Sequence, residues 1–161
     1  MANVDYFLKL EGIEGESTDD KHKNEIDVLS YSWGATQSGT AGHGGGGGAG
    51  KVSMQDFQFT MRVNKATPKL MLACATGQHL PEAKLVCRKA GGEQEEYMAV
   101  TMSDLLVSSY QTGGSAGDAI PIESITLNFS TIEVEYKSQK PDGTLDSPVK
   151  VGYDLKANKK I

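Results

Sequence analysis

The sequence predicts a mainly β protein, a closed barrel or sandwich of short strands with one short helix at an end or flank. Three observations support this fold class. Several segments alternate apolar and polar residues with a period of two, as half-buried strands do. One segment has helical spacing instead, and one glycine-rich stretch is too long for an ordinary hairpin turn. Because no internal repeat and no change of composition divides the chain, we expect a single domain over residues 1–161.

The first expected strands lie in the N-terminal half. Residues 6–10 and 26–33 are rich in strand-forming side chains, although their alternation is not strict. The strictest alternation covers residues 57–63, where polar side chains separate four apolar ones. We therefore expect a half-buried strand whose buried face carries Phe57, Phe59, Met61 and Val63.

One segment, residues 68–76, is predicted to be a helix. Thr67 is suited to the N-cap, and Pro68 to the first helical position, where no amide donor is needed. Gly77 is suited to a left-handed stop at the other end. The apolar face is expected to carry Leu70, Met71, Cys74 and Ala75.

The C-terminal half predicts further strands. Residues 83–89 and 98–102 flank Gly91 and Gly92, which predicts a hairpin whose turn needs positive φ. Residues 149–155 alternate again, and their apolar face is expected to carry Val149, Val151, Tyr153 and Leu155.

Within residues 120–136 the apolar phase shifts by one residue between Ser130 and Thr131. The apolar residues before this point are odd-numbered, and those after it are even-numbered. A one-residue shift exchanges the two faces of a strand. We therefore expect a bulge there, or a strand that passes from one sheet to another.

Composition and charge exclude several classes of function. The net charge is −5, whereas a nucleic-acid partner would require a basic surface. No stretch approaches the roughly 18 apolar residues of a membrane span, and the first residues lack the basic and apolar regions of a signal peptide. We expect no nucleic-acid partner, no membrane insertion and no cleaved signal peptide.

Motifs for catalysis or cofactor binding are incomplete. Gly45, Gly50 and Lys51 have the spacing of a phosphate-binding loop, but Val52 stands where a Ser or Thr must be, and no helix follows. The three histidines do not form a pair at metal-ligand spacing. We expect no metal and no cofactor. Cys74 and Cys87 are expected to be reduced and buried, and the carboxylate pairs to be surface charge: Asp19 with Asp20, and Glu95 with Glu96.

Blocks along nearly the whole chain match one known family in its order. They are YFLKLEGIEG at 6–15, IDVLSYSWG at 26–34, KATPKLMLAC at 65–74, RKAGG at 88–92, SSY at 108–110, PIESITLNFSTIEVE at 121–135 and GYD at 152–154. Together they resemble Hcp, the haemolysin-coregulated protein of bacterial type VI secretion systems. Two departures are Tyr31, where the family often has tryptophan, and the run of glycines within residues 39–50, which is less typical.

The resemblance implies a small β-barrel of two sheets with a flanking helix, and a structural role with no enzymatic activity. It implies hexameric rings that stack into a hollow tube, propelled by a contractile sheath and tipped by a VgrG spike. Small effector proteins would travel in the lumen. The protein would be made in the bacterial cytoplasm and secreted by the type VI apparatus, and no fused toxin domain is expected after the last matching block.

Two other functions remain open. One is a monomeric β module that binds carbohydrate or acts as an adhesin, which the mass in solution would distinguish from a ring. The other is an enzyme that uses Cys74 or the glycine-rich loop. Loss of function on changing one polar residue, with assembly intact, would favour the enzyme.

The glycine-rich loop, expected over residues 39–51, is the candidate contact between stacked rings. It contains eight glycines in the twelve residues from 39 to 50. Because glycine loses the most backbone entropy when it is ordered, we expect the loop to become ordered only against a neighbour; a permanently disordered insertion is the alternative. The candidate residues are Gly39, Gly42, His43, Gly44, Gly45, Gly46, Gly47, Gly48, Gly50 and Lys51.

Overall fold

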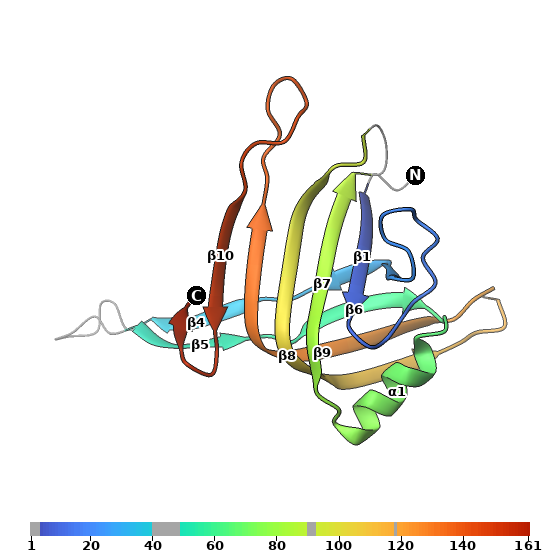
Figure 1. The fold of residues 1–161 in the computed structure, drawn as a ribbon. Coiled ribbons are helices and arrows are strands. Elements are labelled where there is room, and N and C mark those ends of the chain that lie inside the picture. The colour runs from blue at the N-terminus through green and yellow to red at the C-terminus, as the bar shows by residue number, and fades with distance from the viewer. Residues whose placement is uncertain (1–3, 40–48, 90–92, 118) are drawn as a thin grey trace.

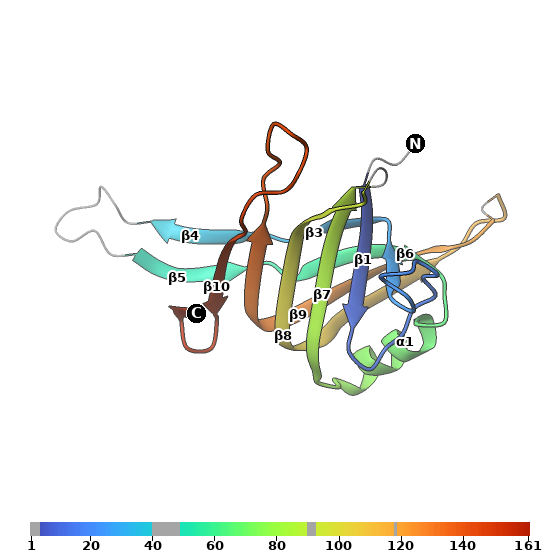
Figure 2. The ribbon, with the colours of Figure 1, turned by 45° about the horizontal axis from the view of Figure 1, so that its top comes forward.

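The structure is a computed structural model and describes residues 4–39, 49–89, 93–117 and 119–161. It is mainly β, as expected, with one helix among these residues, and its strands form two layers (Figures 1 and 2). The elements are β1 Val4–Leu10, β2 Ile26–Val28, β3 Ser30–Ser32, β4 Ala35–Gly39, β5 Ala49–Met54, β6 Phe57–Arg62, α1 Thr67–Thr76, β7 Leu80–Lys89, β8 Glu96–Gly113, β9 Ile122–Tyr136, β10 Val149–Asp154 and β11 Lys159–Lys160.

The paired strands surround a single apolar core. The long strands β7, β8 and β9 pair in sequence order, β1 pairs with β7, and β2 pairs with β1. One residue later, the amide of Leu29 donates to the carbonyl of Thr60 at 2.8 Å, and β3 then pairs with β6, which pairs in turn with β9. Phe57, Phe59 and Met61 of β6 are fully buried, as predicted.

Strand β9 passes from one layer to the other where the apolar phase changes. Its first part, up to Leu127, pairs with β6, and its second part, from Thr131, pairs with β10. Phe129 is buried on the odd-numbered face and Ile132 on the even-numbered face. The predicted phase shift between Ser130 and Thr131 is therefore confirmed, because the core lies on opposite faces of the strand before and after this corner.

The corner is fastened by Asp104 of β8, whose backbone has a positive φ of 49°. The hydroxyl of Ser130 donates to the Asp104 carbonyl at 2.8 Å. The Asp104 carboxylate accepts hydrogen bonds from the ammonium of Lys156 and from Nδ1 of His79, the latter at 3.1 Å. These bonds, first that from Lys156, lower the pKa of Asp104 to about 2. The chain after β10 is thus tied to the bend of β8.

Helix α1 confirms the predicted segment but corrects its details. Gly77 ends the helix in the left-handed conformation, at φ 65°, as expected. The N-cap is Ala66, without a side-chain cap, because the hydroxyl of Thr67 is used elsewhere. The buried face was predicted in part: Leu70 is fully buried and Cys74 packs partly buried against the core, but Ala73 is buried in place of Met71 and Ala75. Met71 and Leu72 point to solvent, and Ala75 is exposed.

Two strand predictions have different outcomes. The hairpin of β7 and β8 is confirmed by their antiparallel pairing, although Gly91 and Gly92 lie outside the described residues. The prediction for Val63 was wrong, since β6 ends at Arg62 and the Val63 side chain is 39% exposed. Its amide instead donates to the Pro121 carbonyl at 3.0 Å, at the base of the β8–β9 turn.

Candidate assembly surfaces

The strands beside the glycine-rich stretch form an arm that extends away from the barrel (Figures 1 and 2). The arm, β4 with β5, pairs from Ala35 opposite Met54 to Gly39 opposite Ala49. Every residue of β4 is exposed. An isolated two-stranded hairpin is at best marginally stable in water. The arm is therefore suited to contact with another molecule.

The predicted loop of residues 39–51 is corrected at both ends. Gly39 ends β4, and Gly50 and Lys51 lie within β5, because backbone pairing continues without apolar side chains. The register shifts between Gln37 and Gly39, and a Cβ on Gly50 would lie 2.3 Å from Oγ of Ser38 and 2.9 Å from the Ser38 backbone carbonyl oxygen, which cannot rotate away. This bulge therefore requires glycine. The other candidate residues lie outside the described residues: Gly42, His43, Gly44, Gly45, Gly46, Gly47 and Gly48.

Strand β10 carries an apolar face that the described part of the chain leaves uncovered. The prediction placed Val149 and Val151 on a buried face, but they are 68% and 66% exposed. Tyr136, opposite Val149 on β9, is 48% exposed. The cause is position: β10 lies near the edge of its sheet, between β9 and the two-residue β11. The alternation thus predicted the strand correctly but the burial of Val149 and Val151 wrongly, while Tyr153 and Leu155 are half-buried.

The loop between β1 and β2 folds over the outer face of the barrel and is held by a buried arginine. Arg88 of β7 is 2% exposed and donates two hydrogen bonds to Asp19, at 2.9 and 2.7 Å, and one to Asp5 at 3.1 Å. Its guanidinium lies 4.8 Å from the ring centre of Phe7. The hydrogen bonds from Arg88 lower the pKa of Asp19 to about 2. Surface charge was thus a wrong prediction for Asp19.

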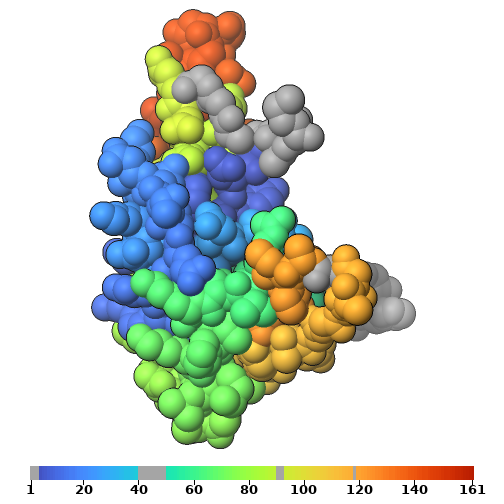
Figure 3. Space-filling view, turned by 90° about the vertical axis from the view of Figure 1, so that its right-hand side faces the viewer, coloured from blue at the N-terminus to red at the C-terminus, as the bar shows by residue number. Residues whose placement is uncertain are grey.

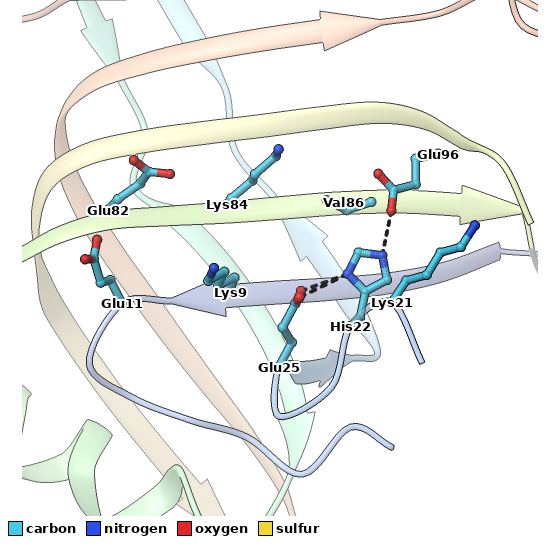
Figure 4. Close-up of a pocket in the computed structure, with 9 residues that line it drawn as sticks. All are labelled: Lys9, Glu11, Lys21, His22, Glu25, Glu82, Lys84, Val86 and Glu96. Atoms are coloured by element: carbon cyan, nitrogen blue, oxygen red, sulfur yellow. Dashed lines mark hydrogen bonds and ion pairs between the residues drawn. The ribbon is translucent and has the colours of Figure 1, made fainter. Parts of the chain in front are cut away.

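His22 of the same loop lies beside a charged groove (Figure 4). Its ring stacks on Phe7 with 4.4 Å between ring centres, and its two nitrogens face Glu25 at 3.0 Å and Glu96 at 2.7 Å. Surface charge was therefore also an incomplete prediction for Glu96. Three lysines and four glutamates line this groove of about 450 Å³. The hydrogen bonds of His22 to Glu25 and Glu96, with its stacking on Phe7, therefore hold the loop against β1 and β8.

A buried carboxylate joins α1 to the barrel. Glu123 of β9 is 1% exposed and accepts hydrogen bonds from the hydroxyl of Thr67, at 2.6 Å, and from that of Tyr110. Burial raises the pKa of Tyr110, and the Glu123 charge raises it further. The start of the helix is therefore fixed to two neighbouring strands.

The cysteines are both free, and they differ in burial. Cys87 is fully buried, as predicted, and burial raises the pKa of its thiol to about 11. Cys74 is only half-buried. Within the described ranges no cluster of three or more His, Cys, Asp or Glu side chains is placed to hold a metal ion. None of the helices described is long and apolar enough to cross a membrane.

The chain is similar to known proteins over most of its length. Residues 7–136 match the family described as "Type VI secretion system effector, Hcp". The chain belongs to the Hcp family. Protein hcp1 of Pseudomonas aeruginosa is 52% identical to this Hcp-family chain over 157 residues, which covers 96% of this chain and 97% of that protein.

Solved structures agree with the Hcp assignment. Hcp1 from Salmonella typhimurium superposes with a TM-score of 0.83 at 42% identity, over 99% of this chain and 100% of that one. A chain of the anti-feeding prophage baseplate superposes with a TM-score of 0.53 at 14% identity, over 83% of this chain and 93% of that one. This second likeness concerns the fold alone.

The contacts that fasten the β1–β2 loop were not predicted from the sequence. The partners of Arg88 are 69 and 83 residues away, so no local pattern connects them. One signal was available: Arg88 shares the strand phase of Val86, and an arginine in phase with an apolar residue needs a partner if it is buried.

Proposed function

We propose that this Hcp-family chain is the structural subunit of a type VI secretion tube. Copies assemble into hexameric rings, and the rings stack into a hollow tube that a contractile sheath propels behind a VgrG spike. Small effector proteins travel in the lumen. The chain is made in the bacterial cytoplasm, carries no cleaved signal peptide and acts without enzymatic chemistry or a cofactor.

One observation carries this proposal: the folded chain has surfaces that a single copy does not complete. The β4–β5 arm extends away from the barrel, and the apolar face of β10 is exposed at Val149 and Val151. Exposed apolar surface and unpaired strand edges favour association with other chains. A heterologous contact repeated between identical copies closes into a ring. The Hcp family match supports this role.

The glycine-rich loop remains the proposed contact between rings, now limited to residues 40–48, which connect β4 to β5 in the sequence. The paired strands β4 and β5, between which this segment lies in the sequence, extend away from the barrel. Each glycine that becomes ordered at such a contact costs roughly 1–2 kcal/mol of backbone entropy. Stacking is therefore expected to be weak in dilute solution and strong only along a growing tube.

Light scattering and negative-stain images of the purified protein test the ring. A mass of six copies and ring-shaped particles are expected, whereas a monomer at micromolar concentration and neutral pH contradicts the proposal. Replacing residues 40–48 by an Asn-Gly turn tests stacking: rings should persist while tubes and secretion are lost. A Gly-Ser replacement of equal length is the control, since it keeps the length and removes His43. Normal tubes and normal export from the shortened protein would show that the loop is only an insertion.

Secretion without processing is tested in the culture supernatant. Mass spectrometry of the exported protein is expected to find an N-terminus at Met1 or Ala2. A shorter N-terminus produced by signal cleavage would contradict this part of the proposal.

A further inference from the structure

Two segments on opposite sides of the molecule differ in their charged residues. Residues 11–27 contain seven carboxylates and two lysines, whereas residues 137–161 contain six lysines and three carboxylates. The first segment lies beside β1 on the right of Figure 1, and the second surrounds β10 towards the left. Three of the six lysines already pair with carboxylates outside the second segment: Lys137 with Glu135, Lys150 with Glu133 and Lys156 with Asp104. The exposed lysines next to β10 are therefore Lys159 and Lys160 of β11. The first segment is called the acidic end, and β10 with β11 the basic end.

The acidic end contains a recess whose lining includes two exposed apolar side chains. Val63 and Ile120 line a hollow of about 210 Å³ together with Glu16, Asp27 and Arg62. Their side chains are 39% and 50% exposed. The loop after β1 and the turn between β8 and β9, which form its rims, share the face seen in Figure 3.

The recess carries two carboxylates, those of Glu16 and Asp27, and one guanidinium, that of Arg62. Burial raises the pKa of Asp27, and the charges of Asp5 and Asp19 raise it further, while Arg62 opposes them. An approaching ammonium group would relieve this repulsion. The recess therefore favours a partner that brings apolar side chains with lysines beside them.

The basic end has that composition. Val149 and Val151 are the most exposed large apolar side chains of β10, at 68% and 66%. Lys159 and Lys160 form the neighbouring strand β11, and both are exposed. The register places Lys160 opposite Tyr153, on the strand that carries the two valines.

We propose that the β10–β11 end of one copy packs against the acidic recess of the next copy. Val149 and Val151 lie on Val63 and Ile120, and the lysines of β11 face the carboxylates at the rim of the recess. An apolar centre with a charged rim is the usual anatomy of a protein interface. Because the two surfaces differ, the contact repeats head to tail, and it closes into a ring when the rotation between neighbouring copies returns to the first copy. This inference rests on the proposed tube-subunit function, to which it adds the surfaces that meet within a ring.

Charge reversal tests the electrostatic half of the contact. The pair Glu16→Lys with Asp27→Lys is expected to weaken ring association about tenfold or more, and so is the pair Lys159→Glu with Lys160→Glu. Combining all four changes is expected to restore the ring, because each charge again faces its opposite. Lys140→Glu, in the loop between β9 and β10, is the control and should leave rings unchanged. Association is followed by light scattering over a range of protein concentrations.

Cross-linking tests the apolar half. In a Cys74→Ala background, Ile120→Cys combined with Val151→Cys should give a ladder of covalent species up to the full ring with a short bismaleimide. Leu72→Cys combined with Val151→Cys is the control, since Leu72 is exposed on α1 and lies outside the proposed contact; it should give no ladder. If rings form normally, show no cross-linking and are unchanged by the charge reversals, the proposed interface is wrong. The tube-subunit function would be unaffected by that result. A wild-type chain that stays monomeric overturns the tube-subunit function itself.

Discussion

Replacing Asp19 by asparagine should remove the charge that Arg88 binds and lower the stability of the folded chain. The change preserves the shape of the side chain, but it replaces one acceptor oxygen by an amide that cannot accept from the guanidinium. Arg88 is 2% exposed, and its two hydrogen bonds to Asp19 measure 2.9 and 2.7 Å. Asp5, at 3.1 Å, remains as a carboxylate partner.

The size of the effect follows from the proton affinity of Asp19. Its pKa falls from 3.8 to about 2, mainly through the hydrogen bonds from Arg88. A tenfold change in proton affinity corresponds to about 1.4 kcal/mol, so the ionised carboxylate contributes about 2 kcal/mol to folding. For a chain of this length the variant should lose about 4–8 °C in Tm. The Asp19 side chain is 22% exposed, so the loss should stay below the roughly 3–5 kcal/mol of a fully buried pair.

Thermal unfolding at several pH values, at one fixed protein concentration, tests this reasoning. Because the folded-state pKa is lowered, the stabilisation is fully present above pH 3.8 and is lost as the pH falls through about 2. The difference between wild type and Asp19→Asn should therefore be constant near neutrality and vanish towards pH 2. Asp20→Asn, at the exposed neighbouring carboxylate, is the control and should change stability by less than about 0.5 kcal/mol. Equal stability of wild type and variant at pH 7, or a difference that persists at pH 2, would refute the assigned role.

Other changes test the remaining contacts. Glu123→Gln should lower the free energy of unfolding, measured in urea, by about 1–3 kcal/mol, because one hydroxyl loses its acceptor. Glu135→Gln, at a half-exposed site, is the control and should lower it much less. Equal losses would contradict the buried contact. Gly50→Val should increase hydrogen exchange in the arm and leave the Tm of the barrel unchanged, because its Cβ would meet Ser38 at 2.3 Å; an unchanged arm would contradict the bulge. Replacing Cys74 and Cys87 by alanine should leave small cavities, which lower the free energy of unfolding by about 1 kcal/mol for the buried thiol and so lower the Tm. Light scattering should still find intact rings, and a disulfide required for rings would contradict this.

Much of the barrel could be predicted because local patterns determine it. The alternation of β6 placed Phe57, Phe59 and Met61 in the core, since period-two burial is a property of the strand itself. The phase shift at Ser130 located the corner of β9, because a strand that changes layer must change its buried face. Gly77 was predictable for a similarly local reason, as only a left-handed residue ends the helix in this way.

The clusters that fasten the barrel could not be predicted, because their partners are distant in sequence. Arg88, Asp19 and Asp5 come from β7, the β1–β2 loop and β1, and they meet only after folding. The helix start was misread for the same reason. Thr67 has a hydroxyl suited to an N-cap, but Glu123, 56 residues away, accepts a hydrogen bond from it instead. Local capping preference is weaker than a hydrogen bond to a buried carboxylate.

The wrong prediction for β10 has a different origin. Its alternation is as regular as that of β6, yet Val149 and Val151 are exposed in the single chain. An apolar pattern indicates which side chains gain from burial, and it does not indicate whether the covering surface belongs to the same chain. Full burial of one valine side chain contributes roughly 1.5 kcal/mol or more. A surface of a second copy can bury the valine as well as another part of the same chain can. The valines of β10, which the sequence pattern predicts to be buried and which are exposed in the single chain, therefore belong to one of the two surfaces proposed to join neighbouring subunits. The other surface, at Val63 and Ile120, departs in the same way, since Val63 was also expected to be buried.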